Sequence, residues 1–170
     1  MTKRILFLGL LVLAFSLNAC DDSSSSSSEN DAVGSFPAKG DPDFYCNVTE
    51  GSDNGTYWIE MKVNIPKYKG HLERLTYDDK GNGTQYIEDA YFRISMGNMV
   101  EMCLDFKQFI REEKQERNIT ESYCKNGVSY FVTEFKNVSM SNLVSRGSGF
   151  HEQCKDYKRD WESGEYDDYQ

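Results

Sequence analysis

The first twenty residues constrain the rest of the chain most, because they decide the compartment in which it folds. Lys3 and Arg4 precede an unbroken apolar run over residues 5–15, and small residues follow that run. This is the pattern of an export signal. The apolar stretch is shorter than the about 20 residues that a membrane-spanning helix needs. We therefore expect residues 1–19 to be removed as a signal peptide.

The end of this signal carries a more specific pattern. Leu17-Asn18-Ala19-Cys20 resembles the lipobox of bacterial lipoprotein precursors, with leucine three positions before the cysteine and a small residue directly before it. The resemblance implies that Cys20 gains a diacylglyceryl group and becomes the acylated N-terminus. Two or three acyl chains, such as palmitate, hold a protein stably on a membrane. The alternative is an ordinary signal peptide, with Cys20 as one more disulfide partner.

Residues 20–43 are expected to form the lipidated N-terminus and a disordered linker. Ser23 to Ser28 is a homopolymer run, and acidic residues, glycines and prolines follow it. Such a composition cannot bury enough apolar surface to offset the entropy of ordering. Serine runs after a lipobox are similar to the tethers of surface lipoproteins. This favours the outer membrane or cell surface of a bacterial envelope over the inner membrane.

The chain is acidic throughout its remaining length. Without residues 1–19, 17 basic side chains stand against 28 acidic ones, which gives a formal charge of −11. Nucleic acid binding requires a basic surface, so no nucleic acid partner is expected. The same charge disfavours adhesion to anionic headgroups, so the membrane contact would come from the lipid on Cys20.

Four cysteines remain when Cys20 is assigned to lipid: Cys46, Cys103, Cys124 and Cys154. An even number in an exported chain predicts two disulfides. Three pairings are open. Tyr45-Cys46-Asn47 and Tyr123-Cys124-Lys125 each precede a strand and a later helix with a cysteine. If this similarity between the two halves reflects a duplication, it favours the pairs Cys46–Cys103 and Cys124–Cys154.

Residues 44–163 are predicted to form a single α+β domain, followed by an acidic tail, residues 164–170. Two hairpins are expected, one with strands at 44–49 and 57–65 and one with strands at 119–124 and 128–135, the latter joined by Asn126-Gly127. In the 57–65 strand, apolar and polar side chains alternate. Strands at 72–77 and 85–94 are expected between the hairpins.

Two segments show helical periodicity instead. Met96, Met99, Cys103, Phe106 and Ile110 recur at spacings of three and four, with Asn98 as the expected N-cap of a helix over residues 98–117. Phe150, Cys154, Tyr157 and Trp161 predict a shorter helix that ends before Gly164. A loop or a helical turn is expected up to Ser148. The predicted architecture is therefore antiparallel hairpins or a meander packed against two amphipathic helices, with two disulfides.

No catalytic motif occurs in the sequence, so no catalytic residue is assigned. His71, expected in a turn, and His151, beside the apolar face of the last helix, are interpreted as structural. Asp78 to Asp89 approaches the spacing of a calcium loop, but Lys80 occupies a ligand position, so a hairpin turn is favoured. We expect no metal site and no cofactor.

Trp58 is the side chain with the strongest claim to a binding role. It falls on the polar face of its strand, where an exposed aromatic ring would stack on a sugar or a partner surface. The other interpretation is that a helix covers that face and that Trp58 belongs to the core.

These observations favour a non-enzymatic binding or interaction domain on a lipid anchor, with a protein or polysaccharide partner. The alternatives are a carboxylate-dependent polysaccharide hydrolase and a purely structural spacer. The hydrolase requires two acids facing each other across a cleft at about 5–10 Å. The spacer predicts no concave site.

Overall fold

The structure is a computed structural model that describes residues 32–37, 40–92 and 99–169. The predicted signal peptide, Cys20 and most of the predicted linker lie outside these residues, as do Met96 and Asn98. Within the described residues, no helix combines the length and the apolar character needed to cross a bilayer.

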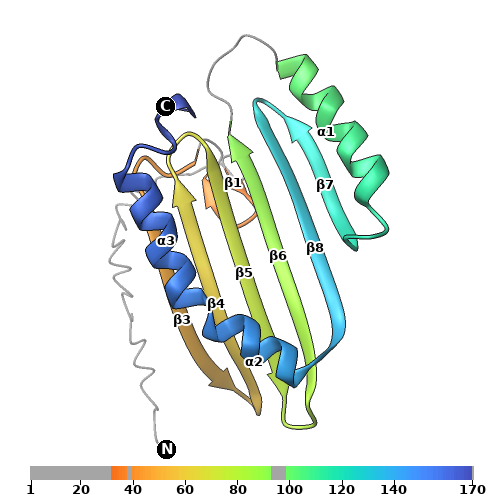
Figure 1. The fold of residues 1–170 in the computed structure, drawn as a ribbon. Coiled ribbons are helices and arrows are strands. Elements are labelled where there is room, and N and C mark those ends of the chain that lie inside the picture. The colour runs from red at the N-terminus through yellow and green to blue at the C-terminus, as the bar shows by residue number, and fades with distance from the viewer. Residues whose placement is uncertain (1–31, 38–39, 93–98, 170) are drawn as a thin grey trace, which may run out of the picture.

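A six-stranded antiparallel sheet forms the centre of the fold, with the strand order β3-β4-β5-β6-β8-β7 (Figure 1). The first four strands follow one another as a meander, and β8 lies between β6 and β7. The strands are β3 (Tyr45–Asp53), β4 (Thr56–Ile65), β5 (Lys69–Asp78), β6 (Asn82–Phe92), β7 (Ile119–Lys125) and β8 (Val128–Ser139).

Local turn chemistry joins the predicted hairpins. Asn126 and Gly127 both have positive φ, at 53° and 78°, as a two-residue type I′ turn requires. Asn54 and Gly55 repeat this geometry between β3 and β4, at 49° and 78°. The β3 strand therefore extends to Asp53, four residues beyond its predicted end. The turn between β5 and β6 is held by Asp78, whose Oδ1 accepts hydrogen bonds from the backbone N–H of Lys80 and Asn82.

The helices are α1 (Met99–Glu113), α2 (Met140–Ser148) and α3 (Phe150–Glu162). The predicted helices at 98–117 and from Phe150 correspond to α1 and α3. The segment expected as a loop or helical turn is the nine-residue helix α2, which the Ser139 side chain caps by accepting a hydrogen bond from the backbone N–H of Asn142. The fold is therefore α+β.

All three helices lie on one face of the sheet, here called the helix face. The apolar side of β4 packs there beneath α2 and α3, around the fully buried Phe150. Phe106 and Phe109 of α1 contact Phe131, which shares that face through the register of β8 with β6. In Figure 1, α2 and α3 cross the half of the sheet that contains β3, β4 and β5, and α1 lies at the opposite edge beside β7.

A short hairpin covers part of the opposite face, here called the hairpin face. It consists of β1 (Ala32–Val33) and β2 (Phe36–Pro37). Val33 and Phe36 are buried against a second core cluster that includes Leu72, Ala90 and Val132. These residues belong to the segment predicted as a disordered linker, so ordered structure begins earlier than expected. The ordering is explained by two apolar side chains within an otherwise polar segment.

The predicted presence of two disulfides is confirmed, but the favoured pairing is wrong. The structure joins Cys46 to Cys154 and Cys103 to Cys124, with Cα–Cα distances of 5.4 and 5.5 Å. The first bond ties β3 to α3, and the second ties α1 to β7. The favoured pairs are separated because β3 and β7 form opposite edges of the sheet.

Candidate functional site

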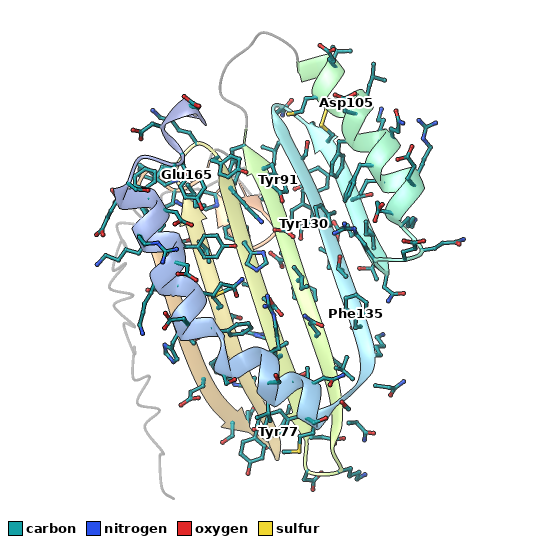
Figure 2. All side chains as sticks on the ribbon, in the orientation of Figure 1. Tyr77, Tyr91, Asp105, Tyr130, Phe135 and Glu165 are labelled. Atoms are coloured by element: carbon teal, nitrogen blue, oxygen red, sulfur yellow. A yellow bond between two sulfur atoms is a disulfide. The ribbon has the colours of Figure 1, made fainter. Side chains whose placement is uncertain are left out.

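A groove lined by aromatic rings lies on the helix face, over β6 and β8 and beside α1. Its volume is about 620 Å³. Figure 2 shows Tyr91 on β6 and Phe135 on β8 in the part of the sheet between α1 and the α2–α3 pair. We call it the aromatic groove, and its five rings belong to Tyr91, Phe106, Phe109, Phe131 and Phe135.

The floor of the aromatic groove follows from the two-residue period of its strands. Ile87, Asp89 and Tyr91 alternate along β6, and Phe131, Thr133 and Phe135 alternate along β8. The antiparallel register places Asp89 opposite Phe131 and Ile87 opposite Thr133. All six side chains therefore point to one face.

The helix α1 supplies the wall of the aromatic groove. The rings of Phe106 and Phe109 lie 6.3 and 5.7 Å from the ring of Phe131, centroid to centroid. The guanidinium of Arg117 lies 5.5 Å from the centroid of Phe109 and donates to the Glu113 carboxylate at 2.8 Å. The Cys103–Cys124 disulfide fixes α1 to the sheet. The wall is held in place by both packing and a covalent bond.

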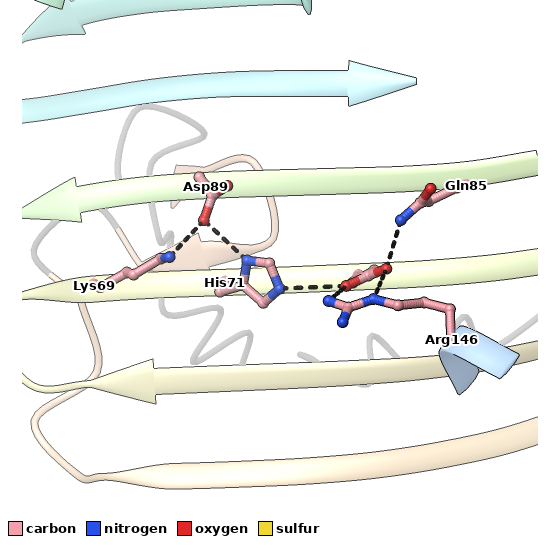
Figure 3. A network of polar contacts seen from close by, with 6 residues as sticks. Lys69, His71, Gln85, Asp89 and Arg146 are labelled. Carbon is pink, nitrogen blue, oxygen red and sulfur yellow. Dashed lines mark hydrogen bonds and ion pairs between the residues drawn. The ribbon is translucent and has the colours of Figure 1, made fainter. Parts of the chain in front are cut away.

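A row of polar side chains, here called the polar ladder, runs beside the aromatic groove (Figure 3). It consists of Lys69, His71 and Glu73 on β5, Gln85 and Asp89 on β6, and Arg146 on α2. At one end, a single oxygen of Asp89 bonds both Lys69 and His71. The Asp89 Oδ1 lies 3.0 Å from Lys69 Nζ and 2.9 Å from His71 Nδ1. Because His71 lies directly opposite Asp89 in the register, this contact is a cross-strand pair.

Glu73 forms the other end of the polar ladder and is fully buried. Its Oε1 accepts hydrogen bonds from Arg146 Nε at 2.8 Å and from Gln85 Nε2 at 2.7 Å. Its Oε2 accepts a second bond from Arg146 Nη2 at 2.5 Å and lies 3.9 Å from His71 Nε2. The bidentate pair joins α2 to the centre of the sheet, since Arg146 belongs to α2.

The electrostatics of the polar ladder favour the charged form of each group. Burial works against the charge of His71, but the hydrogen bond to Asp89 and the nearby Glu73 carboxylate outweigh it and raise the pKa of His71. The pKa of Lys69 is also raised, because Asp89 outweighs the effect of burial. Burial alone would raise the pKa of both carboxyls. The nearby His71 and the hydrogen bonds from Arg146 instead lower the pKa of Glu73 to about 2, and His71 and Lys69 lower that of Asp89.

This electrostatic state determines which chemistry suits the site. A glycosidase needs one carboxyl with a raised pKa to act as a general acid. Asp89, the carboxylate that lines the aromatic groove, is held ionised, and so is Glu73 behind it. The described residues contain no group of three or more His, Cys, Asp or Glu side chains arranged for a metal ion. The groove is therefore suited to binding through its rings.

The residues singled out from the sequence lie elsewhere, except for His71. His71 is in the middle of β5 within the polar ladder, so its placement in a turn was wrong. His151 is exposed in the first turn of α3. The hairpin turn predicted at Asp78 is confirmed.

Trp58 is half-buried on the hairpin face, so no helix covers it and it belongs to neither core cluster. Its ring packs against Gly51, and the guanidinium of Arg74 lies 5.4 Å from its centroid. Trp58 also borders a pocket of about 590 Å³ at this end of the sheet. The exposed ring there is that of Tyr57, stacked on Tyr77 at 5.3 Å.

The rings of the aromatic groove were not singled out as a site from the sequence. Phe131 lies among buried residues of β8 and Phe135 lies between Glu134 and Lys136, so neither ring differs from an ordinary strand pattern. The register with β6 and the position of α1 decide which of these rings face a groove. Comparison of the chain with protein-family models, with curated proteins and with solved structures gives no match.

Proposed function

We propose that this protein is a lipid-anchored binding protein of the bacterial envelope, without catalytic activity, whose aromatic groove holds an apolar segment of a partner protein. The observation that carries the proposal is the groove itself, in which five rings line about 620 Å³ on the helix face. Concave sites lined by apolar and aromatic side chains are typical of binding pockets.

The polar groups of the aromatic groove favour a peptide over a polysaccharide. Sugar hydroxyls need hydrogen-bonding partners when they leave water. Lys69 and Asp89 bond each other, and Arg117 bonds Glu113, so few polar groups are left to receive hydroxyls. Apolar peptide side chains need only the rings. A hydrolase has less support because Asp89 is held ionised, and a spacer would not need a concave site.

The disulfide pairing supports the proposed lipid anchor on Cys20. The four described cysteines pair with one another, which leaves Cys20 for lipidation. The β1–β2 hairpin begins at Ala32, so the linker predicted from the sequence is shortened to residues 21–31. A flexible coil of that length spans roughly 17–20 Å on average. It joins the domain on the hairpin face, and the aromatic groove lies on the opposite face, accessible to a partner.

The test uses the full chain and a library of random twelve-residue peptides displayed on phage. Enriched peptides should carry apolar and aromatic residues. Their affinity should fall at least tenfold for Phe135→Ala, which removes one ring of the aromatic groove, and should stay within twofold for Trp58→Ala. Equal binding to the wild type and to Phe135→Ala would refute the groove as the site. Binding of cellulose, chitin or peptidoglycan that depends on Trp58 would favour the polysaccharide alternative instead.

A further inference from the structure

The strand β7 forms one edge of the sheet, and its outer side is unpaired within the described residues. Alternate residues of an antiparallel strand direct their backbone groups to opposite sides. A two-residue turn closes on a hydrogen-bonded pair, here Lys125 with Val128. The N–H and C=O groups of Cys124 and Ser122 therefore point away from β8. Such groups are a template for another strand.

A second groove, here called the edge groove, lies along this strand. It has a volume of about 460 Å³ and is bounded by α1 and by Ser122, Tyr123 and Cys124 of β7. The Cys103–Cys124 disulfide holds the helix beside the strand. The groove between α1 and the edge of β7 offers an extended segment hydrogen bonds on one side and side-chain contacts on the other.

The side of α1 that borders the edge groove combines apolar and basic residues. Val100, Leu104, Lys107 and Arg111 follow one another at spacings of four, three and four, which places them in one stripe. Val100 and Leu104 are 76% and 60% exposed, which is unusual for large apolar side chains in this fold. Leu104, Lys107 and Arg111 all line the edge groove.

The charges in the stripe indicate the chemistry of the occupant. Neither Lys107 nor Arg111 forms an ion pair with another described residue, although the chain carries a net charge of −9. In an added strand every second side chain would point toward α1, so two unpaired cations there complement a segment with carboxylates at alternate positions. A second copy of β7 would instead bring these cations close to their own counterparts, which is unfavourable.

We propose that the edge groove binds an extended acidic peptide of a partner protein as an added seventh strand, antiparallel or parallel to β7. The backbone of Ser122 and Cys124 supplies the hydrogen bonds, and Lys107 and Arg111 pair with alternate carboxylates. This site lies between α1 and the outer edge of β7 and shares a single lining residue, Phe106, with the aromatic groove. The proposal therefore stands whether or not the proposed function is correct.

The probe is a synthetic six-residue peptide, acetylated and amidated, that alternates valine and glutamate. Binding to the full chain is followed by chemical-shift changes and by amide hydrogen exchange. We expect the amides of Ser122 and Cys124 to exchange at least tenfold more slowly with the peptide bound. A peptide with lysine in place of glutamate should bind at least fivefold more weakly. A peptide N-methylated at alternate residues, on its hydrogen-bonding edge, should give no protection.

Two pairs of matched variants locate the site. Lys107→Glu should weaken binding at least fivefold, whereas Lys80→Glu, the same change in the distant β5–β6 turn, should not. Ser122→Pro removes an outward N–H and should abolish protection at Cys124. Ser52→Pro is its counterpart on β3, the other edge strand, and should leave binding unchanged. If Ser122→Pro fails to fold, the binding measured for Lys107→Glu decides whether the peptide occupies the edge groove.

The proposal is overturned if the acidic peptide protects no β7 amide at millimolar concentration, or if Lys107→Glu binds as tightly as the wild type. Protection of Ser122 that grows with protein concentration in the absence of peptide would also overturn it, because the occupant would then be a second copy. Loss of binding in Phe135→Ala alone would move the peptide to the aromatic groove and refute this inference without refuting the proposed function.

Discussion

Replacing Arg146 by methionine tests the polar ladder most directly. The change removes two charge-assisted hydrogen bonds from the fully buried Glu73 while keeping an apolar stem of similar length. The pKa of Glu73 falls from 4.5 to about 2 on folding, which corresponds to about 3 kcal/mol from all of its partners together. Arg146 is 44% exposed, so solvent screens part of its share.

We therefore expect Arg146→Met to lower the free energy of unfolding by about 2 kcal/mol at pH 7, or the midpoint of thermal unfolding by roughly 6–8 °C. The measurement is urea unfolding with intact disulfides, followed by tryptophan fluorescence. Arg159→Met on α3 is the matched control. Arg159 bonds only exposed carboxylates, so its loss should not change the free energy of unfolding measurably.

The pH dependence gives a second readout with a defined sign. The folded pKa of Glu73 lies below its unfolded value, so its stabilisation is fully present above pH 4.5 and is lost as the pH falls from 4.5 toward 2. The difference between the wild type and Arg146→Met should shrink over that range. Adding Glu73→Gln should recover part of the loss, because no unpaired charge then remains buried. A change below about 0.5 kcal/mol at pH 7 would refute the reasoning.

Three further predictions concern other parts of the fold. The pKa of His71 is raised on folding, so its stabilisation of the folded state is fully present below pH 6.5 and is lost as the pH rises through its folded pKa. The free energy of unfolding, measured from pH 6 to 9, should therefore fall more steeply in the wild type than in His71→Gln. Replacing Cys103 and Cys124 by serine opens a loop with a sequence separation of 21 and should cost about 3 kcal/mol, and peptide mapping without reduction should recover Cys46–Cys154 intact. A Cβ at Gly70 would lie 2.7 Å from the Phe36 ring, so Gly70→Ala should displace the β1–β2 hairpin and speed chymotrypsin cleavage after Phe36 several-fold, whereas Gly149→Ala should not.

The elements that local sequence determines were predicted well. The alternation in β4 and the Asn-Gly turn between β7 and β8 depend on residues that are close in the chain. The same holds for the apolar spacings of α1 and α3. Each of these patterns reflects the side-chain period of a single strand or helix, and that period can be recognised in the sequence without knowing which elements pack against it.

The disulfide pairing could not be predicted because it depends on strand order. The chain leaves β6, passes through α1 and returns as β7 at the far edge, and β8 then fills the position between them. This crossover brings Cys124 beneath Cys103 in α1. The resemblance between the two cysteine-bearing halves predicted equivalent positions, but β3 and β7 occupy opposite edges.

The polar ladder was missed for a related reason. Lys69, His71 and Glu73 alternate along β5, a pattern that predicts an exposed strand face. His71 and Glu73 are buried and Lys69 is half-buried because partners from other elements compensate their charges, Asp89 from β6 and Arg146 from α2. Which charge lies opposite which is set by register and helix position. Likewise, the only large apolar side chains in the predicted linker are those of Val33 and Phe36.

The polar ladder also accounts for the aromatic groove beside it. Toward β4, the ladder adjoins the apolar core under α2 and α3, and toward β8 it adjoins the rings of the groove. Lys69 and Asp89 line the groove while ionised, and an apolar helix laid across them would remove their hydration without adding hydrogen bonds. The position of α1 beside β7 avoids that cost. The charges on β5 and β6 therefore leave this part of the sheet without a helix across it, and the half-buried rings of Tyr91 and Phe135 remain at its surface.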